Sequence, residues 1–217
     1  MTDDSGARST RRAFIGGLAV AGTAGLAGCG ALTGGNDTPT DTIDPDADTL
    51  PTPVRGDPDA DVTVAVFEDY ACGHCAAYNL EQLPALESEY IEPGTIRYEQ
   101  YDLPLPLSAE SWRAPNAARA VQDTVGLDAY WEFSHALFAN QGRLGLSLYE
   151  ELASEVGADP DTVRSAAVDR EYDATVRESR QHGFDQGVDA TPTIIVNGNM
   201  LDSYGSEAIA QAIEAER

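Results

Sequence analysis

The chain has 217 residues, of which 37 are acidic and 13 basic, and every basic residue is an arginine. A formal net charge of −24 excludes a basic nucleic-acid surface, because phosphates would be repelled, and three cysteines are too few for a disulfide-scaffolded miniprotein. Acidity without any lysine indicates adaptation to high salt, where a Debye length of roughly 3 Å screens the self-repulsion. An ordinary acidic protein is the alternative.

Residues 1–28 are predicted to be an export signal. Arg11 and Arg12 precede an uncharged, glycine-rich run, which resembles a twin-arginine (Tat) signal. The run over 13–28 is shorter than the roughly 20 residues that a membrane-spanning helix needs. The segment Leu26-Ala27-Gly28-Cys29 resembles a lipobox, which implies cleavage before Cys29 and a lipid on its new amino terminus. An uncleaved anchor and cleavage with an unmodified Cys29 are the alternatives, and all three place the rest outside the cytoplasm.

Residues 29–59 are predicted to be a disordered tether. From Asn36 to Asp59 the chain has five Pro, five Thr and seven Asp in 24 positions, so little surface is buried and like charges repel. At about 3 Å per residue this stretch reaches on the order of 70 Å. Asn36 begins the chain's N-glycosylation sequon, Asn-Asp-Thr, and an unmodified linker is the alternative.

The remaining residues, 60–217, are predicted to form one α/β domain, which begins with a strand, a helix and a second strand. Residues 62–67 are β-branched and apolar, which is typical of a short buried strand. The helix that follows carries Tyr78, Leu83, Leu86 and Tyr90 on one side, and Pro84 is expected to kink it. Residues 95–101 are expected to form the second strand.

Helices are predicted through most of the next stretch, up to about residue 183. They are expected near 114–125, 127–140 and 148–156, and a further helix begins after Asp159-Pro160, where Asp can cap and Pro suits the first helical position. A strand over 191–196 follows. Asn197-Gly198 predicts a hairpin turn into a return strand, and an amphipathic helix is expected over 207–216.

Cys72 and Cys75 are the residues that the sequence singles out for chemistry. Together with Gly73 and His74 they stand at the junction of the 62–67 strand and the following helix. Unpaired N–H groups and the helix dipole favour an anion there, which lowers the pKa of Cys72, and a protonated His74 adds positive charge. A stabilised thiolate makes a Cys72–Cys75 disulfide a stronger oxidant. This redox-active disulfide is expected to serve without a cofactor.

Other interpretations of the cysteine pair are weaker. A structural disulfide closing a four-residue loop contributes only roughly 2 kcal/mol. A zinc site needs about four ligands, whereas the chain has one Cys-x-x-Cys and three histidines, with His135 and His182 distant in sequence. No metal site is therefore expected. We expect His135 to pack on a helix face and His182 to favour a helix C-terminus, and we assign Trp131, Phe133 and Phe138 to the core.

The segment from Glu68 to Cys75 resembles the active-site entry of DsbA-like thiol:disulfide oxidoreductases of the thioredoxin fold. Residues 83–84, 130–133, 137–141, 187–193 and 196–198 are similar to further segments of that family, and together the likeness covers about 62–216. It implies a central mixed sheet flanked by helices, with a helical block at about 108–186 inserted between the second and third core strands. It also implies a cis bond at Thr191-Pro192, with both residues binding substrate. With the high-salt composition, the chain resembles a haloarchaeal lipoprotein of that family.

Two features depart from the family pattern. Thioredoxin-like proteins often have a buried acid six residues before the nucleophile, and here that position is Val66. Glu68 is a candidate substitute only if its side chain does not face solvent. The Gly73-His74 pair resembles that of protein disulfide isomerase, which implies a potential nearer about −180 mV than the −270 mV of thioredoxin.

The function that these features predict is an extracytoplasmic, lipid-anchored thiol:disulfide oxidoreductase acting on exported proteins. An oxidase or isomerase is favoured over a reductase. A membrane or small-molecule redox partner is expected to recycle the enzyme. Two other functions stay open, a non-enzymatic tethered binding lipoprotein and a copper-delivery protein that uses Cys72, Cys75 and one histidine.

Overall fold

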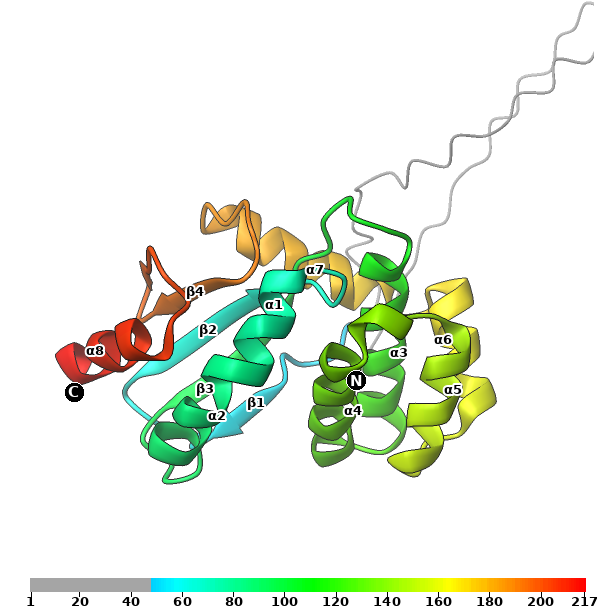
Figure 1. Cartoon of the computed structure of the whole chain (residues 1–217), viewed down its shortest axis with the longest axis horizontal. Coiled ribbons are helices and arrows are strands. Elements are labelled where there is room, and N and C mark those ends of the chain that lie inside the picture. The colour runs from blue at the N-terminus through cyan, green and yellow to red at the C-terminus, as the bar shows by residue number, and fades with distance from the viewer. Residues whose placement is uncertain (1–47) are drawn as a thin grey trace, which may run out of the picture. The chain divides into compact units, whose positions relative to one another are not determined.

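A five-stranded sheet lies beside a block of helices in the computed structural model, which describes residues 48–217 (Figure 1). The strands are β1 (Val54–Gly56), β2 (Thr63–Glu68), β3 (Arg97–Asp102), β4 (Thr193–Val196) and β5 (Asn199–Met200), in the order β1-β3-β2-β4-β5. β2 and β3 are parallel, and the other pairs are antiparallel. This confirms the predicted α/β class with a central mixed sheet.

The prediction of a disordered tether over 29–59 is wrong for residues 54–56, because they form the edge strand β1. Val54 pairs with Glu99 of β3, and the Leu50 amide donates to Thr175 Oγ1 at 3.0 Å. An extended segment satisfies the open edge of β3 with its own backbone groups, and composition alone does not reveal such pairing. The signal at 1–28, Cys29, Asn36 and the tether as far as residue 47 lie outside the described residues.

One irregular helical segment follows β2. It consists of α1 (Gly73–Ala77), the π-helical η1 (Tyr78–Gln82), α2 (Leu83–Leu86) and the π-helical η2 (Glu87–Ile91). The four apolar positions predicted for one face of this helix are all buried. Pro84 has no N–H to donate, which weakens the regular ladder, and the disturbance expected there takes the form of wide π-helical turns before and after α2.

The helical block runs from β3 to β4. It contains α3 (Glu110–Thr124), α4 (Leu127–Ala139), the short 3-10 helix η3 (Gln141–Arg143), α5 (Leu146–Glu155), α6 (Pro160–Asp169) and α7 (Asp173–Asp185). The predicted start of α6 is confirmed, because Asp159 is its N-cap and accepts from the Thr162 amide at 2.8 Å. Trp131, Phe133 and Phe138 are buried, as expected.

The last elements follow the predicted order. Asn197 and Gly198 have φ of 45° and 82°, the left-handed values that a tight hairpin requires, and they join β4 to β5. The terminal helix is α8 (Ser206–Glu216). None of the helices within residues 48–217 is long and apolar enough to cross a membrane.

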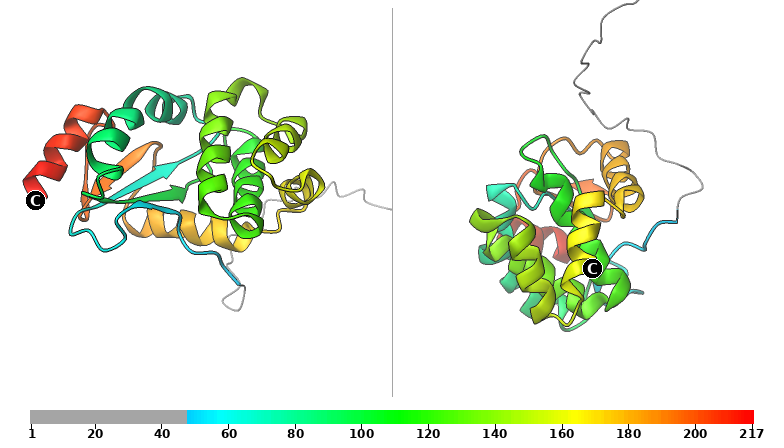
Figure 2. Two further views of the ribbon diagram at one scale, coloured as in Figure 1. Left: turned by 90° about the horizontal axis from the view of Figure 1, so that it is seen from below. Right: turned by 90° about the vertical axis from the view of Figure 1, so that its right-hand side faces the viewer.

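Alternate residues of β2 point into two different parts of the core. Val64 and Val66 belong to the large cluster that includes residues of α1, α2, α8 and the helical block. Ala65 and Phe67 belong to a smaller cluster on the other face, where a Cβ on Gly183 of α7 would lie 3.0 Å from the Phe67 ring. Figure 2 shows α7 on one face of the sheet and the α1–α2 segment with α8 on the other. Because side chains alternate along a strand, Glu68 faces the same side as Val66.

Candidate active site

Cys72 is the N-cap of α1, directly beyond the C-terminal end of β2. Its carbonyl accepts from the amides of Cys75 at 3.1 Å and Ala76 at 3.2 Å, which closes the first helical turn. Its half-buried sulfur donates to the Thr191 carbonyl at 3.4 Å. The junction of strand and helix therefore places Cys72 where the sequence predicts it.

The two cysteines differ sharply in acidity. The pKa of Cys72 is lowered to about 5, chiefly because the Cys75 thiol donates to its thiolate, with help from Thr191 and from the backbone N–H groups of Cys75 and His74. Burial raises the pKa of Cys75, and the bond to Cys72 and the charge of Glu68 raise it further. At pH 7 a thiol with that lowered pKa is about 99% thiolate. Both cysteines are free; Cys72 is half-buried and can serve as a nucleophile, whereas Cys75 is buried and protonated.

Thr191 and Pro192 come to the nucleophile from far along the chain. Their peptide bond is cis, which confirms what the family resemblance implies. The Thr191 hydroxyl oxygen is buried and has no hydrogen-bond partner among residues 48–217. It therefore remains available to donate to the thiolate once the Cys72 proton is gone.

His74 is exposed and turns toward Tyr204, a residue that the sequence analysis does not identify. The imidazole Nδ1 lies 3.1 Å from the Tyr204 hydroxyl, which comes from the segment between β5 and α8. Gly73 is also exposed. The two residues between the cysteines therefore form the outer surface of the site.

Glu68 is buried, so a solvent-facing side chain at this position is excluded. It is 3% exposed, and its Oε1 accepts from Asn79 Nδ2 at 2.5 Å. Burial raises the pKa of Glu68 to about 8, and the negative charges of Asp102 and Cys72 add to this, while the Asn79 bond opposes it. The same Asn79 amide donates to the Cys75 carbonyl at 3.0 Å. A protonated carboxyl therefore lies beneath the cysteine pair, two positions along the strand from Val66.

Asp69 supports the turn that leads to Cys72. Its two carboxylate oxygens accept from the amides of Ala71 and Leu105, each at 2.8 Å. Burial raises the pKa of Asp69, and these backbone bonds oppose the increase. Sequence reasoning missed this role. It also missed Asn79, although the spacing of four residues from Cys75 on a helix is a signal that could have indicated it.

The other histidines lie away from this arrangement. His135 is exposed rather than packed. His182 lies in the last turn of α7, as expected for a residue near a helix C-terminus. Its ring also contacts Tyr101, with ring centroids 4.7 Å apart, and it bonds to Gln186. Within residues 48–217 no group of three or more His, Cys, Asp or Glu side chains is arranged to hold a metal ion.

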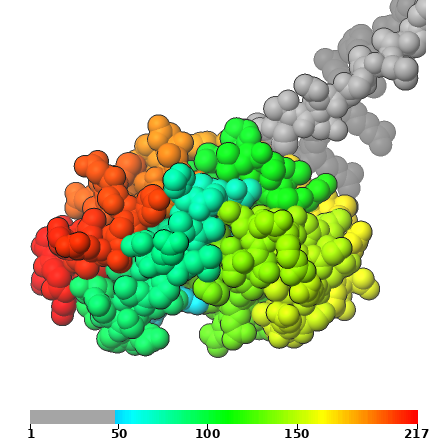
Figure 3. Space-filling model, viewed as in Figure 1, coloured from blue at the N-terminus to red at the C-terminus, as the bar shows by residue number. Residues whose placement is uncertain are grey.

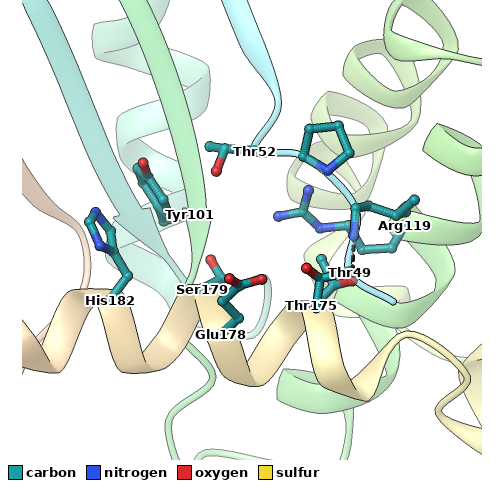
Figure 4. A pocket seen from close by; sticks show the side chains of 10 residues that line it. Thr49, Thr52, Tyr101, Arg119, Thr175, Glu178, Ser179 and His182 are labelled. Atoms are coloured by element: carbon teal, nitrogen blue, oxygen red, sulfur yellow. Dashed lines mark hydrogen bonds between the residues drawn. The ribbon is translucent and has the colours of Figure 1, made fainter. Parts of the chain in front are cut away.

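A separate pocket of about 440 Å³ lies between the N-terminal segment, α3 and α7 (Figure 4). Arg119 lines it and forms a buried ion pair with Asp102 at 2.7 Å. None of the residues that the sequence predicts for the active site lines this pocket. Its other walls are Leu50, Pro51, Glu178, His182 and several hydroxyl-bearing side chains, and the ion pair already satisfies the charge of Arg119.

Comparison with known proteins gives one family match and relatives of two kinds. A family model described as thioredoxin matches residues 48–215. Disulfide bond formation protein D of Bacillus subtilis is 25% identical over 176 residues, covering 76% of each chain. The Na⁺/H⁺ antiporter NhaA 1 of Salinispora arenicola is 31% identical over 172 residues, which is 79% of this chain but 25% of the antiporter. The chain thus spans about a quarter of the length of that relative.

Solved structures agree on the architecture. Oxidised BdbD from Bacillus subtilis is 26% identical with a TM-score of 0.71, and the match covers 76% of this chain and 92% of that one. The thiol-disulfide exchange protein α-DsbA2 from Wolbachia pipientis has a TM-score of 0.66 at 24% identity, covering 76% and 87%. The predicted thioredoxin fold with an inserted helical block is confirmed.

Proposed function

The chain belongs to the thioredoxin family, and from that premise we propose that it is an extracytoplasmic protein that donates or exchanges disulfides in exported proteins. It is a thiol:disulfide oxidoreductase, and Cys72 and Cys75 are its redox pair. The observation that carries the proposal is the contrast between the two sulfurs, because a low-pKa, accessible thiolate beside a buried thiol is what exchange requires.

In the oxidising direction a substrate thiolate attacks Cys72 Sγ of the Cys72–Cys75 disulfide. The sulfur–sulfur bond between the cysteines breaks, a mixed disulfide forms, and Cys75 leaves with the electron pair and takes up a proton. A second substrate thiolate then attacks the substrate sulfur of the mixed disulfide, and Cys72 leaves as a thiolate. The substrate has lost two electrons as its two thiols become a disulfide, and the enzyme is left reduced.

Glu68 is placed to exchange that proton with Cys75. Its carboxyl is neutral near pH 7, because its pKa is about 8, and when it ionises its negative charge raises the pKa of Cys75. A buried carboxyl with such a pKa can give a proton and take it back at physiological pH. The role that thioredoxin-like proteins give to an acid at the position of Val66 thus falls to Glu68, on the same face of β2.

Disulfide donation or exchange is favoured over reduction. Whatever stabilises the Cys72 thiolate stabilises the reduced protein, and this makes the disulfide a stronger oxidant. Four groups do so here, namely the Cys75 thiol, the Thr191 side chain and the backbone amides of Cys75 and His74. A membrane or small-molecule oxidant must then take two electrons from the dithiol to restore the disulfide.

Export and anchoring complete the proposal. Residues 1–28 act as a Tat-type signal, Cys29 carries the lipid, and Asn36 is a glycosylation site on the tether. The composition, with 37 acidic residues and arginine as the sole basic residue, supports a haloarchaeal origin. The expected location is the outer face of the cell membrane.

The reduction potential of the Cys72/Cys75 pair tests the proposal. We would equilibrate the full chain carrying Cys29→Ser with glutathione mixtures in molar KCl, using Cys72→Ser in the same background as the control without a redox pair. A value above about −200 mV is expected for a disulfide donor or isomerase. A value near −270 mV would identify a reductase. Absence of reversible exchange would refute the oxidoreductase and favour a binding lipoprotein.

A further inference from the structure

The backbone turn that carries the nucleophile is bound by a side chain of the helical block. Gln141 lies in η3, and its Nε2 donates to the carbonyls of Tyr70 and Cys72, both at 2.8 Å. These partners are 71 and 69 positions away in sequence. In Figure 3 the surface around α1 lies between the yellow-green helical block and the orange-red region that contains β4 and α8.

Asp69 and Gln141 form hydrogen bonds with different backbone groups of this turn. Asp69 accepts from the Ala71 amide, and its backbone carbonyl accepts from the Cys72 amide at 2.9 Å. Gln141 supplies the donors for the two carbonyls. Tyr70 is 2% exposed, so its carbonyl would lose its bond to Gln141 in a place where water has poor access.

The bond to the Cys72 carbonyl bears on the sulfur of the same residue. That carbonyl accepts from the Ala76 amide and from the Cys75 amide, and the Cys75 amide also donates to the Cys72 sulfur. A carbonyl oxygen has two lone pairs. The Cys75 N–H is thus shared between this oxygen and the sulfur, and the bonds from Gln141 and Ala76 to the oxygen weaken its attraction for that hydrogen. Without Gln141, the oxygen competes more strongly with the sulfur for the same hydrogen.

We propose that Gln141 is a positioning residue for the nucleophile, which holds the Tyr70–Cys72 turn so that backbone N–H groups point to the Cys72 sulfur. The inserted block thereby controls the reactivity of a cysteine that it does not contain. The inference rests on the proposed exchange function for its biological meaning, but the charge state of Cys72 can be measured whether or not exchange occurs.

The block makes another contact to this turn that provides a matched control. Ser134 of α4 lies 2.9 Å from the Tyr70 hydroxyl and also contacts Gln100. This contact reaches a side chain and leaves the carbonyls of the turn untouched. Ser134→Ala is therefore expected to affect stability without changing the pKa of Cys72.

The test is a titration of thiolate absorbance at 240 nm in the reduced full chain carrying Cys29→Ser. Gln141→Met keeps the length of the side chain and removes both donors, and we expect it to raise the pKa of Cys72 by about one unit, a tenfold change in the equilibrium. The equilibrium constant with glutathione at pH 7 should shift about tenfold toward reduced glutathione and oxidised protein.

Gln141→Glu is the second variant, because it keeps the shape of glutamine and replaces the donor group by an acceptor. It should raise the pKa of Cys72 at least as far, and it decides the question if Gln141→Met does not fold. A thiolate titration that is unchanged in a folded variant would overturn the proposal, and so would loss of stability alone, which would show a purely structural contact. Absence of exchange in the parent protein would instead refute the proposed function and leave this titration readable.

Discussion

Glu68→Gln is expected to remove a large pH dependence from the stability of the protein. The pKa of Glu68 is about 8 in the folded protein, against 4.5 for an ordinary glutamate, because burial disfavours its charge. The folded state therefore binds more protons than the unfolded state between these values, and stability is lost as pH rises through this window. A difference of 3.5 pKa units corresponds to roughly 5 kcal/mol. Glutamine has the same shape, can still accept from Asn79, and does not ionise.

The assay is denaturant unfolding at pH 4.5, 7 and 9 in constant molar KCl. From pH 4.5 to 9 the free energy of unfolding of wild type should fall by up to about 5 kcal/mol relative to that of Glu68→Gln, and most of this fall should be complete by pH 9. Cys72 titrates in both proteins, so its contribution cancels in the difference apart from its repulsion with Glu68, which only wild type has. Glu81→Gln changes an exposed position on the same helical segment, and its free energy of unfolding should show the same pH dependence as that of wild type. A constant difference between wild type and Glu68→Gln at all three pH values would refute the reasoning.

Three further outcomes are expected. The absorbance of the reduced protein at 240 nm should titrate with a midpoint near pH 5, from the pKa of Cys72, and a midpoint near 8.5 would contradict the hydrogen bonding described above. Arg119→Met should cost about 3–5 kcal/mol in urea unfolding, since it leaves Asp102 charged and buried without its partner; a loss below about 1 kcal/mol would show that the pair is solvated. Gly183→Ala should cost about 1–3 kcal/mol, because its Cβ would lie 2.7 Å from a Leu103 methyl group, whereas Gly142→Ala, with open space around it, should unfold like wild type.

Local patterns in the sequence were sufficient for most of the elements. The β-branched run over 62–67, the apolar spacing of the next helix, the Asp159-Pro160 start and the Asn197-Gly198 turn each depend on residues within a few positions of one another. The placement of Cys72 at a helix N-terminus belongs to the same class, because a strand followed at once by a helix defines that position. The cis bond at Thr191-Pro192 came from family resemblance, since spacing alone does not predict it.

The burial of Glu68 is only partly predictable from the local sequence. The alternation of a strand places residues 66 and 68 on one face, so the sequence contained the information that Glu68 points inward with Val66. The strand alone does not show what packs over its last residue, Glu68. The helical segment that follows β2 provides that cover, and its Asn79 provides the hydrogen bond.

The sequence by itself therefore determined the fold class, the order of the elements and the choice of Cys72 and Cys75 as the proposed redox pair, because these follow from short-range periodicity and from residue chemistry. Only the tertiary structure decided which groups surround the nucleophile. Thr191 reaches Cys72 across 119 positions and Gln141 across 69, and β1 pairs with an edge 45 residues away that composition does not mark (Val54 with Glu99). Such contacts arise when separately formed elements dock, and the hydrogen bonds that result are made to backbone atoms that every residue possesses.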